Sequence, residues 1–166
     1  MTPYRVLFVC WGNICRSPTA EGILRRLIDE AGLGAEIEVE SAGVSSEHAG
    51  SPPDRRAQAE ASRRGLDLRD LRARRVRADD WERFDLLLVT DPSVERALRR
   101  QAPRGAVLDK VVRITDFATL SDRPTEVPDP YYGGADGFRA VYDLLESACA
   151  GILAHARAES DRAAPA

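Results

Sequence analysis

The stretch "YRVLFVCWGNICRSP" (Tyr4–Pro18) decides the fold. Its first six residues form a largely apolar run, typical of a strand buried on both faces of a parallel sheet. Pro18 suits a first helical turn, and apolar residues spaced three and four apart after it predict a helix over Ser17–Gly32. The loop Trp11–Cys15 between strand and helix therefore lies where open α/β sheets bind ligands.

The rest of the chain repeats this alternation of strand and helix. Four such repeats predict an α/β fold, an open four-stranded parallel sheet with helices on both faces. Asp91 is expected to cap the helix that follows the third strand. Beyond the opening unit, strands are expected over Ala35–Gly43, Phe84–Thr90 and Val111–Thr115, helices over Pro53–Gly65, Asp91–Ala102 and Phe138–Ala158, and a Pro- and Gly-rich loop over Ser121–Gly137.

Length and composition indicate one globular domain. The 166 residues suit a single domain over residues 1–158, with a frayed tail over residues 159–166. A net charge of −3 favours neither nucleic acid nor a membrane surface as a partner, and no apolar run approaches the ~18 residues of a membrane span. The N-terminus is too short for a signal peptide, so we expect a cytoplasmic protein. High Arg and Ala content with a single lysine, Lys110, indicates a GC-rich bacterial genome.

The loop after the first strand has the chemistry of an anion site. Backbone N–H groups of a loop and a helix N-terminus attract a phosphate, and Gly12 permits the tight turn. Arg16 adds a planar fork that suits two phosphate oxygens. The same positive field favours the thiolate of Cys10, and Ser17 could donate a hydrogen bond to its sulfur. A thiolate facing a phosphate cradle is a nucleophile aimed at phosphorus.

No metal or cofactor is needed for this chemistry, and we expect none. The two histidines, His48 and His155, are far apart in the chain, and no cluster of metal ligands stands out. The loop is not a Walker loop, which has a glycine-lysine pair and no cysteine. A cysteine followed by arginine six residues later is a weak signal in so Arg-rich a chain, and it becomes strong with Gly12, Asn13 and Ser17 in place.

These residues resemble the signature of the low-molecular-weight protein tyrosine phosphatases. The resemblance covers nearly the whole chain, in the family's order and spacing. It implies hydrolysis of phosphotyrosine in proteins through a phosphocysteine intermediate on Cys10. The matching segments are "VCWGNICRSP" (Val9–Pro18), "SAG" (Ser41–Gly43), "PPD" (Pro52–Asp54), "RARRV" (Arg72–Val76), "FDLLLVTD" (Phe84–Asp91) and "DPYYGG" (Asp129–Gly134).

The resemblance also implies a role for each site residue. Asp129, from composition alone an ordinary turn residue, would be the general acid that protonates the leaving group and then the base that activates water. Tyr131 and Tyr132 would flank the phenyl ring of the substrate. The remaining substrate-binding positions are those of the loop, with Arg16 as the phosphate ligand: Trp11, Gly12, Asn13, Ile14, Cys15 and Ser17.

Supporting residues follow from the same resemblance. Asn13 and Ser41 match a hydrogen-bonded pair that holds the loop in a strained shape. Cys15 matches a second cysteine that can form a reversible disulfide with Cys10, although a small buried residue is an equal alternative. Cys149, among apolar residues of the last helix, is expected to be a core thiol.

Two positions depart from the family pattern. Leu71 stands where a histidine often joins the support of Asn13 and Ser41. Glu47 stands where an aromatic residue usually lies on the cleft rim, with His48 beside it. Glu47 could change the substrate preference or be merely solvated.

Several alternatives remain at this point. Protein arginine phosphatases of the same fold typically have threonine in place of Ile14 and lack the tyrosine pair. Arsenate reductases need further cysteines, and only Cys149 is left here. A redox thiol protein or a non-catalytic phosphate-binding module would leave Asp129 unexplained. The expected partner is a phosphotyrosine protein such as a bacterial tyrosine kinase, and we expect a monomer.

Overall fold

A four-stranded parallel sheet forms the centre of the molecule. The computed structural model describes residues 2–120, 122 and 124–164. The strand order is β2-β1-β3-β4, and every neighbouring pair is parallel. The predicted fold class is therefore confirmed. The strands are β1 (Tyr4–Cys10), β2 (Ile37–Gly43), β3 (Leu86–Val89) and β4 (Val111–Arg113).

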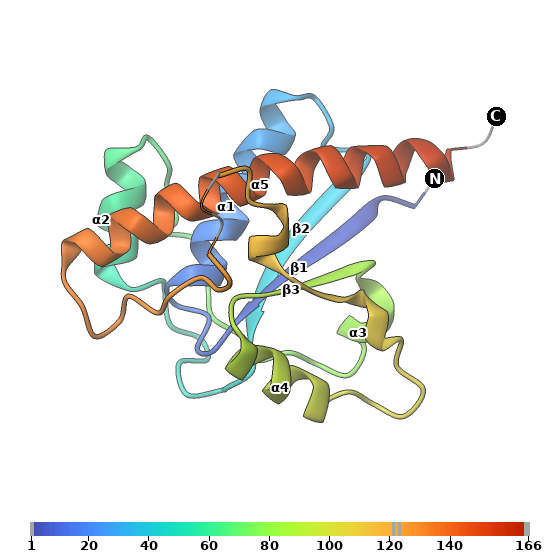
Figure 1. Cartoon of the computed structure of the whole chain (residues 1–166), viewed down its shortest axis with the longest axis horizontal. Helices are drawn as coiled ribbons and strands as arrows, with labels where there is room; N and C mark the ends of the chain where they lie inside the picture. The colour runs from blue at the N-terminus through green and yellow to red at the C-terminus, as the bar shows by residue number, and fades with distance from the viewer. Residues whose placement is uncertain (1, 121, 123, 165–166) are drawn as a thin grey trace.

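Helices cover both faces of this sheet, as predicted (Figure 1). One face carries α1, α2 and the long α5, and the other carries α3 and α4. Asp91 caps α4 by accepting the N–H of Val94 at 2.9 Å, as the sequence indicated. The helices are α1 (Arg16–Glu30), α2 (Arg55–Arg63), α3 (Asp80–Arg83), α4 (Pro92–Arg100) and α5 (Ala135–Ala163), with single 3₁₀ turns at Leu108–Lys110 and Ile114–Phe117.

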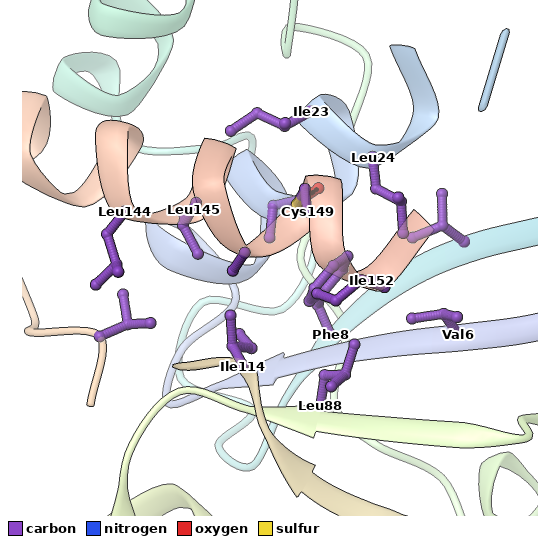
Figure 2. Packing of buried hydrophobic residues seen from close by; sticks show 14 of the residues in the cluster. Val6, Phe8, Ile23, Leu24, Leu88, Ile114, Leu144, Leu145, Cys149 and Ile152 are labelled. Carbon is purple, nitrogen blue, oxygen red and sulfur yellow. Dashed lines mark hydrogen bonds between the residues drawn. The ribbon is translucent and has the colours of Figure 1, made fainter. Parts of the chain in front are cut away.

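The alternating side chains of β1 supply two separate cores. Val6 and Phe8 point to the face of α1 and α5, whereas Leu7 and Val9 point to the face of α3 and α4. Figure 2 shows α5 side chains, Cys149 among them, packed toward Phe8 and the neighbouring strands. Cys149 is fully buried, which confirms its prediction as a core thiol. The central strand is therefore held rigidly from both sides, and so is the loop that follows it.

The structure differs from the sequence-based boundaries mainly around the last helix. α5 begins at Ala135 and continues to Ala163, so residues 159–163 are helical instead of frayed. Three of these five residues, Glu159, Arg162 and Ala163, are good helix formers, and Arg162 pairs with Glu159 across one turn. Of the expected loop and tail, residues 121, 123, 165 and 166 lie outside the described part of the chain.

Two shorter differences lie on the other face and at the sheet edge. The helix α3 was not predicted, because four residues are too few for a periodic pattern. It buries Trp81 against the side of the sheet that carries Leu87. The expected fourth strand ends at Arg113, and the chain turns there into the 3₁₀ segment Ile114–Phe117.

None of the helices within the described residues combines the length and apolar character needed to cross a membrane.

Close packing of α5 on the 3₁₀ segment yields the first prediction. A Cβ added at Gly151 would collide with the backbone carbonyl oxygen of Phe117. We expect Gly151→Ala to lower the free energy of unfolding by about 1–3 kcal/mol in urea denaturation, despite a helix-propensity gain of about 1 kcal/mol. Gly137→Ala in the same helix is the control, since its Cβ would meet Pro130 at an ordinary 3.6 Å. A stabilised Gly151→Ala protein would contradict this packing.

Candidate functional site

The site lies at the carboxyl edge of the sheet. Cys10 ends β1 beside Gly43, the last residue of β2, and Asp91 follows shortly after β3. The loop Trp11–Cys15 crosses directly over Gly43. A Cβ at Gly43 would lie 2.8 Å from the carbonyl oxygen of Trp11 and 3.1 Å from the nitrogen of Asn13. Only glycine allows the loop to pass this close, which explains the glycine at the end of β2.

Asn13 holds the loop in an unusual backbone conformation. It is the single non-glycine residue with positive φ, 58°, among the described residues. Its buried side-chain amide donates to the hydroxyls of Ser17 at 2.8 Å and Ser41 at 2.9 Å. Its amide oxygen accepts the backbone N–H of Arg74 at 3.0 Å. The predicted pair of Asn13 and Ser41 is therefore present, within a larger network.

Glu21 ends this network on the side of α1. The Ser41 hydroxyl donates to the Glu21 carboxylate at 2.6 Å, and Arg25 donates to the same carboxylate at 2.6 Å. Burial raises the pKa of Glu21, and the bonds from Ser41 and Arg25 offset part of that rise. Leu71, which stands where the family often has a histidine, packs against the core that lies between the sheet and the helices α1 and α5. A carboxylate in the network thus satisfies Ser41 without a contribution from position 71.

The Cys10 sulfur lies at the centre of the loop, in contact with two polar groups. The backbone N–H of Asn13 donates to it at 3.2 Å, and the Ser17 hydroxyl lies 2.9 Å away. The Ser17 hydroxyl accepts a hydrogen bond from Asn13, and its own proton can be donated either to the sulfur or to the carbonyl oxygen of Ala42, which is farther away at 3.5 Å. Both groups are therefore placed to donate hydrogen bonds to the sulfur.

A ring of backbone donors surrounds the mouth of this loop. Within the described part of the chain, several loop N–H groups and those of the first two residues of α1 meet no protein acceptor. Such groups, together with the dipole of a helix, are the arrangement that attracts anions. The unpaired donors are the N–H groups of Gly12, Ile14, Cys15, Arg16 and Ser17.

Arg16 is buried and oriented by an acidic partner. Its side chain is 4% exposed, and its Nη1 donates to Asp91 at 2.6 Å and to the carbonyl oxygen of Val127 at 3.0 Å. Its Nη2 faces the Asp129 carboxylate at 3.7 Å. Burial alone would raise the pKa of Asp91, but the bonds from Val94 and Arg16 hold it below its usual value. Asp91 therefore stays ionised and fixes the guanidinium fork toward the loop.

The cleft above the loop has a volume of about 160 Å³ and brings together most of the predicted site. Trp11 and Tyr131 form parts of its wall, while Tyr132 is 92% exposed at the rim. Tyr131 and Tyr132 meet edge to face with ring centroids 4.9 Å apart. The side chains of Asn13, Ser17 and Ser41 do not line the cleft and are buried behind it. The cleft is lined by Cys10, Trp11, Gly12, Ile14, Cys15, Arg16, Glu47, His48, Asp129, Tyr131 and Tyr132.

The rim also carries both residues of the Glu47 region. Glu47 is exposed, and its carboxylate makes no ion pair with a described residue. The ring of His48 lies against the loop, because a Cβ at Gly12 would come 2.9 Å from it. The His48 ring is also 6.3 Å from that of Tyr131, measured between centroids. Glu47 and His48 both line the cleft, so position 47 lies on its rim, as the resemblance to the family implied.

Cys10 and Cys15 are both free, buried thiols. Burial, with the nearby Asp54 carboxylate second, raises the pKa of Cys15 well above its ordinary value. A disulfide between the two remains a prediction. Among the described residues, no group of three or more His, Cys, Asp or Glu side chains is placed to hold a metal ion.

Several groups in the site were missed in the sequence. Asp91 was expected only as a helix cap, and its pairing with Arg16 was not foreseen. Glu21 was not singled out, because an acidic residue on a helix is usually exposed to solvent. Arg74 contributes a backbone N–H, which no sequence pattern reports. Arg56 donates to the carbonyl oxygen of Gly133 at 3.2 Å and so reaches the segment that carries Asp129. Only the folded chain brings these groups to the site.

Comparisons with known proteins agree with this geometry. The model of the family "Low molecular weight phosphotyrosine protein phosphatase" matches residues 5–162. A Synechocystis protein, by name a low molecular weight protein-tyrosine-phosphatase, is 49% identical over 150 residues, 90% of this chain and 94% of its own.

Solved structures of similar chains show the same fold. The crystal structure of YfkJ from Bacillus subtilis covers 96% of this chain and 98% of its own, with 36% identity and a TM-score of 0.88. The crystal structure of an arginine phosphatase from Drosophila covers 90% of this chain and 96% of its own, with 31% identity and a TM-score of 0.83. The family match over residues 5–162 and the 49% identity show that the chain belongs to the low molecular weight phosphotyrosine protein phosphatase family.

Proposed function

We propose that this protein hydrolyses phosphotyrosine in proteins, with Cys10 as nucleophile and no metal ion. One observation carries the proposal. The Cys10 sulfur accepts from Asn13 and lies 2.9 Å from the Ser17 hydroxyl, inside a loop of unpaired N–H groups closed by Arg16. A thiolate stabilised beneath an anion site is the arrangement that nucleophilic attack on phosphorus requires.

In the first step, the Cys10 thiolate attacks phosphorus and displaces the tyrosine oxygen. The loop N–H groups and Arg16 hold the three equatorial oxygens of the phosphoryl group as the bond to the leaving oxygen breaks. Nη1 of Arg16 is occupied by Asp91, which leaves the other edge of the guanidinium for two phosphate oxygens. Protonated Asp129, 3.7 Å from Nη2, donates its proton to the leaving tyrosine oxygen.

In the second step, water hydrolyses the phosphocysteine. The Asp129 carboxylate takes a proton from the water as its oxygen attacks phosphorus, and the sulfur leaves as a thiolate. The Ser17 hydroxyl and the Asn13 N–H donate hydrogen bonds to the sulfur and stabilise its returning negative charge. Inorganic phosphate departs, and both Cys10 and Asp129 regain their starting forms.

The aromatic wall favours phosphotyrosine over phosphoarginine. Trp11 and Tyr131 line the cleft and offer flat apolar surface to a phenyl ring. The similarity to a Drosophila arginine phosphatase makes phosphoarginine the second candidate. Ile14, which lines the cleft with an apolar side chain, favours phosphotyrosine.

A direct assay tests the nucleophile and the substrate together. We expect wild-type protein in EDTA to hydrolyse a phosphotyrosine peptide, and Cys10→Ser to lower kcat/KM by more than about a thousandfold, because an alcohol is a far weaker nucleophile here. Cys149→Ala, which removes a thiol in the core, is the matched control and should retain activity. Phosphate release from a phosphoarginine peptide is measured in parallel.

Each outcome has a distinct meaning. Preference for the phosphoarginine peptide would overturn the substrate assignment and leave the cysteine mechanism intact. Equal inertness of wild type and Cys10→Ser on both peptides would overturn the proposed activity.

The network around Asn13 gives a third prediction. Asn13→Gly removes the side-chain hydrogen bonds but accepts positive φ freely, whereas Asn13→Ala also strains the backbone. We expect both variants to lower kcat/KM by about 10-fold or more, because the loop N–H groups lose their alignment. Ser147→Ala, whose hydroxyl contacts Thr119 far from the loop, is the control. Full activity of Asn13→Gly would show that the hydrogen bonds are not needed.

The exposed carboxylate of Glu47 gives a fourth prediction. Peptides with arginine beside phosphotyrosine should be hydrolysed with kcat/KM about two- to fivefold above peptides with glutamate there, the size of an exposed ion pair. Glu47→Gln and high salt should each abolish the difference. Glu30→Gln, at the opposite end of α1 from the loop, is the matched control. A preference that persists in Glu47→Gln would assign it to another group.

A further inference from the structure

The segment that carries Asp129 is anchored to the body of the protein mainly at its start. The N–H of Val127 donates to the carbonyl oxygen of Thr90 at 2.8 Å, and the Val127 carbonyl oxygen accepts from Arg16. Asp129 itself is 45% exposed, and the bond it accepts from the N–H of Tyr131 lies within the segment. A general acid has to be held within about 0.5 Å of its working position. The Asp129 carboxylate also lies 3.7 Å from Nη2 of Arg16, a distance too long for a hydrogen bond, so contacts farther along the segment are needed for this precision.

Arg56 makes such contacts. Its Nη1 donates to the carbonyl oxygen of Gly133 at 3.2 Å. Its guanidinium lies over the ring of Tyr131, 5.4 Å from the centroid, and over that of Phe138 at 4.6 Å. Cation–π contacts of this length are attractive. One side chain thus holds the segment just after Asp129 and the first turns of α5.

The same arginine is bound firmly to the phosphate-binding loop through Asp54. Nε and Nη2 of Arg56 donate to the two carboxylate oxygens of Asp54, each at 3.0 Å. The backbone N–H of Asp54 donates to the carbonyl oxygen of Ile14 at 2.7 Å. A bidentate arginine–carboxylate pair fixes direction as well as distance. Ile14, Asp54, Arg56 and Gly133 therefore form one continuous connection from the loop of Cys10 to the segment of Asp129.

We propose that Arg56 is a positioning residue, which sets the distance between the Asp129 carboxyl group and the phosphoryl group held over Cys10. The proposal rests on the proposed function, because it concerns proton delivery in that reaction. Arg56 acts through Asp129 and does not itself touch the reacting atoms.

The leaving-group dependence of kcat/KM distinguishes this role from simple stabilisation. Phenyl phosphate has a strongly basic leaving oxygen, which needs a proton as it departs. Dinitrophenyl phosphate releases the weakly basic dinitrophenolate anion, which departs without a proton. We expect Arg56→Met to lower kcat/KM for phenyl phosphate by roughly 10- to 100-fold, the cost of displacing a catalytic group by about 1 Å. For dinitrophenyl phosphate the loss should be below about threefold.

Matched variants separate position from charge and folding. Arg55→Met, in the adjacent and exposed position of α2, should change neither substrate. Arg56→Lys keeps the charge but loses the two-pronged bond to Asp54, so its loss should be intermediate. Thermal melting of each variant is measured to establish that it is folded at the assay temperature.

A double-mutant cycle with Asp129→Asn completes the test. If Arg56 acts through Asp129, Arg56→Met should add less than about twofold to the loss in Asp129→Asn. Equal losses on both substrates in Arg56→Met, or independent effects in the cycle, would overturn the role of Arg56 alone. An Asp129→Asn protein with wild-type kcat/KM for phenyl phosphate would overturn the proposed acid, and the role of Arg56 with it.

Discussion

The three hydrogen bonds of the Asn13 side chain support everything else in the site. They hold a non-glycine residue at φ 58°, a conformation that costs energy in isolation. That conformation turns the Asn13 N–H toward the Cys10 sulfur and leaves the neighbouring N–H groups free for an anion. Because the partners are Ser17, Ser41 and the backbone of Arg74, the loop is fastened to α1, to β2 and to the segment beside β2 at once.

Charge balance is the second constraint on the site. A buried guanidinium without a partner would be strongly unfavourable, and Asp91 supplies the opposite charge at 2.6 Å. The pairing uses one edge of Arg16 and aims the other toward the phosphate position. The same Asp91 carboxylate caps α4, so the helix on one face of the sheet and the anion site at its edge share one residue. Arg56 and Asp54 repeat this pairing at the rim, where it joins two loops.

The elements of the fold could be predicted because their signals are local. The apolar run of β1, the proline in the first turn of α1, and Asp91 followed by Pro92 each define a strand or a helix end by themselves. The predictions were wrong where an element is very short and where a helix continues beyond its apolar pattern. The four-residue α3 has no period to detect, and the last turn of α5, which ends at Ala163, has almost no apolar residues.

The sequence by itself determined the fold class, the position of the loop, and the placement of Cys10, Arg16 and Ser17 around it, since all three follow from one strand–loop–helix unit. The tertiary structure decided which distant groups complete that unit. Asp91 and Arg56 come from other parts of the chain, and Glu21 of α1 gains its role only from Ser41 of β2. In a chain with 31% charged residues, no local pattern distinguishes these three from solvated ones. Their roles arise only when parallel strands end at one edge of the sheet, because that edge gathers side chains from remote parts of the chain around one cleft.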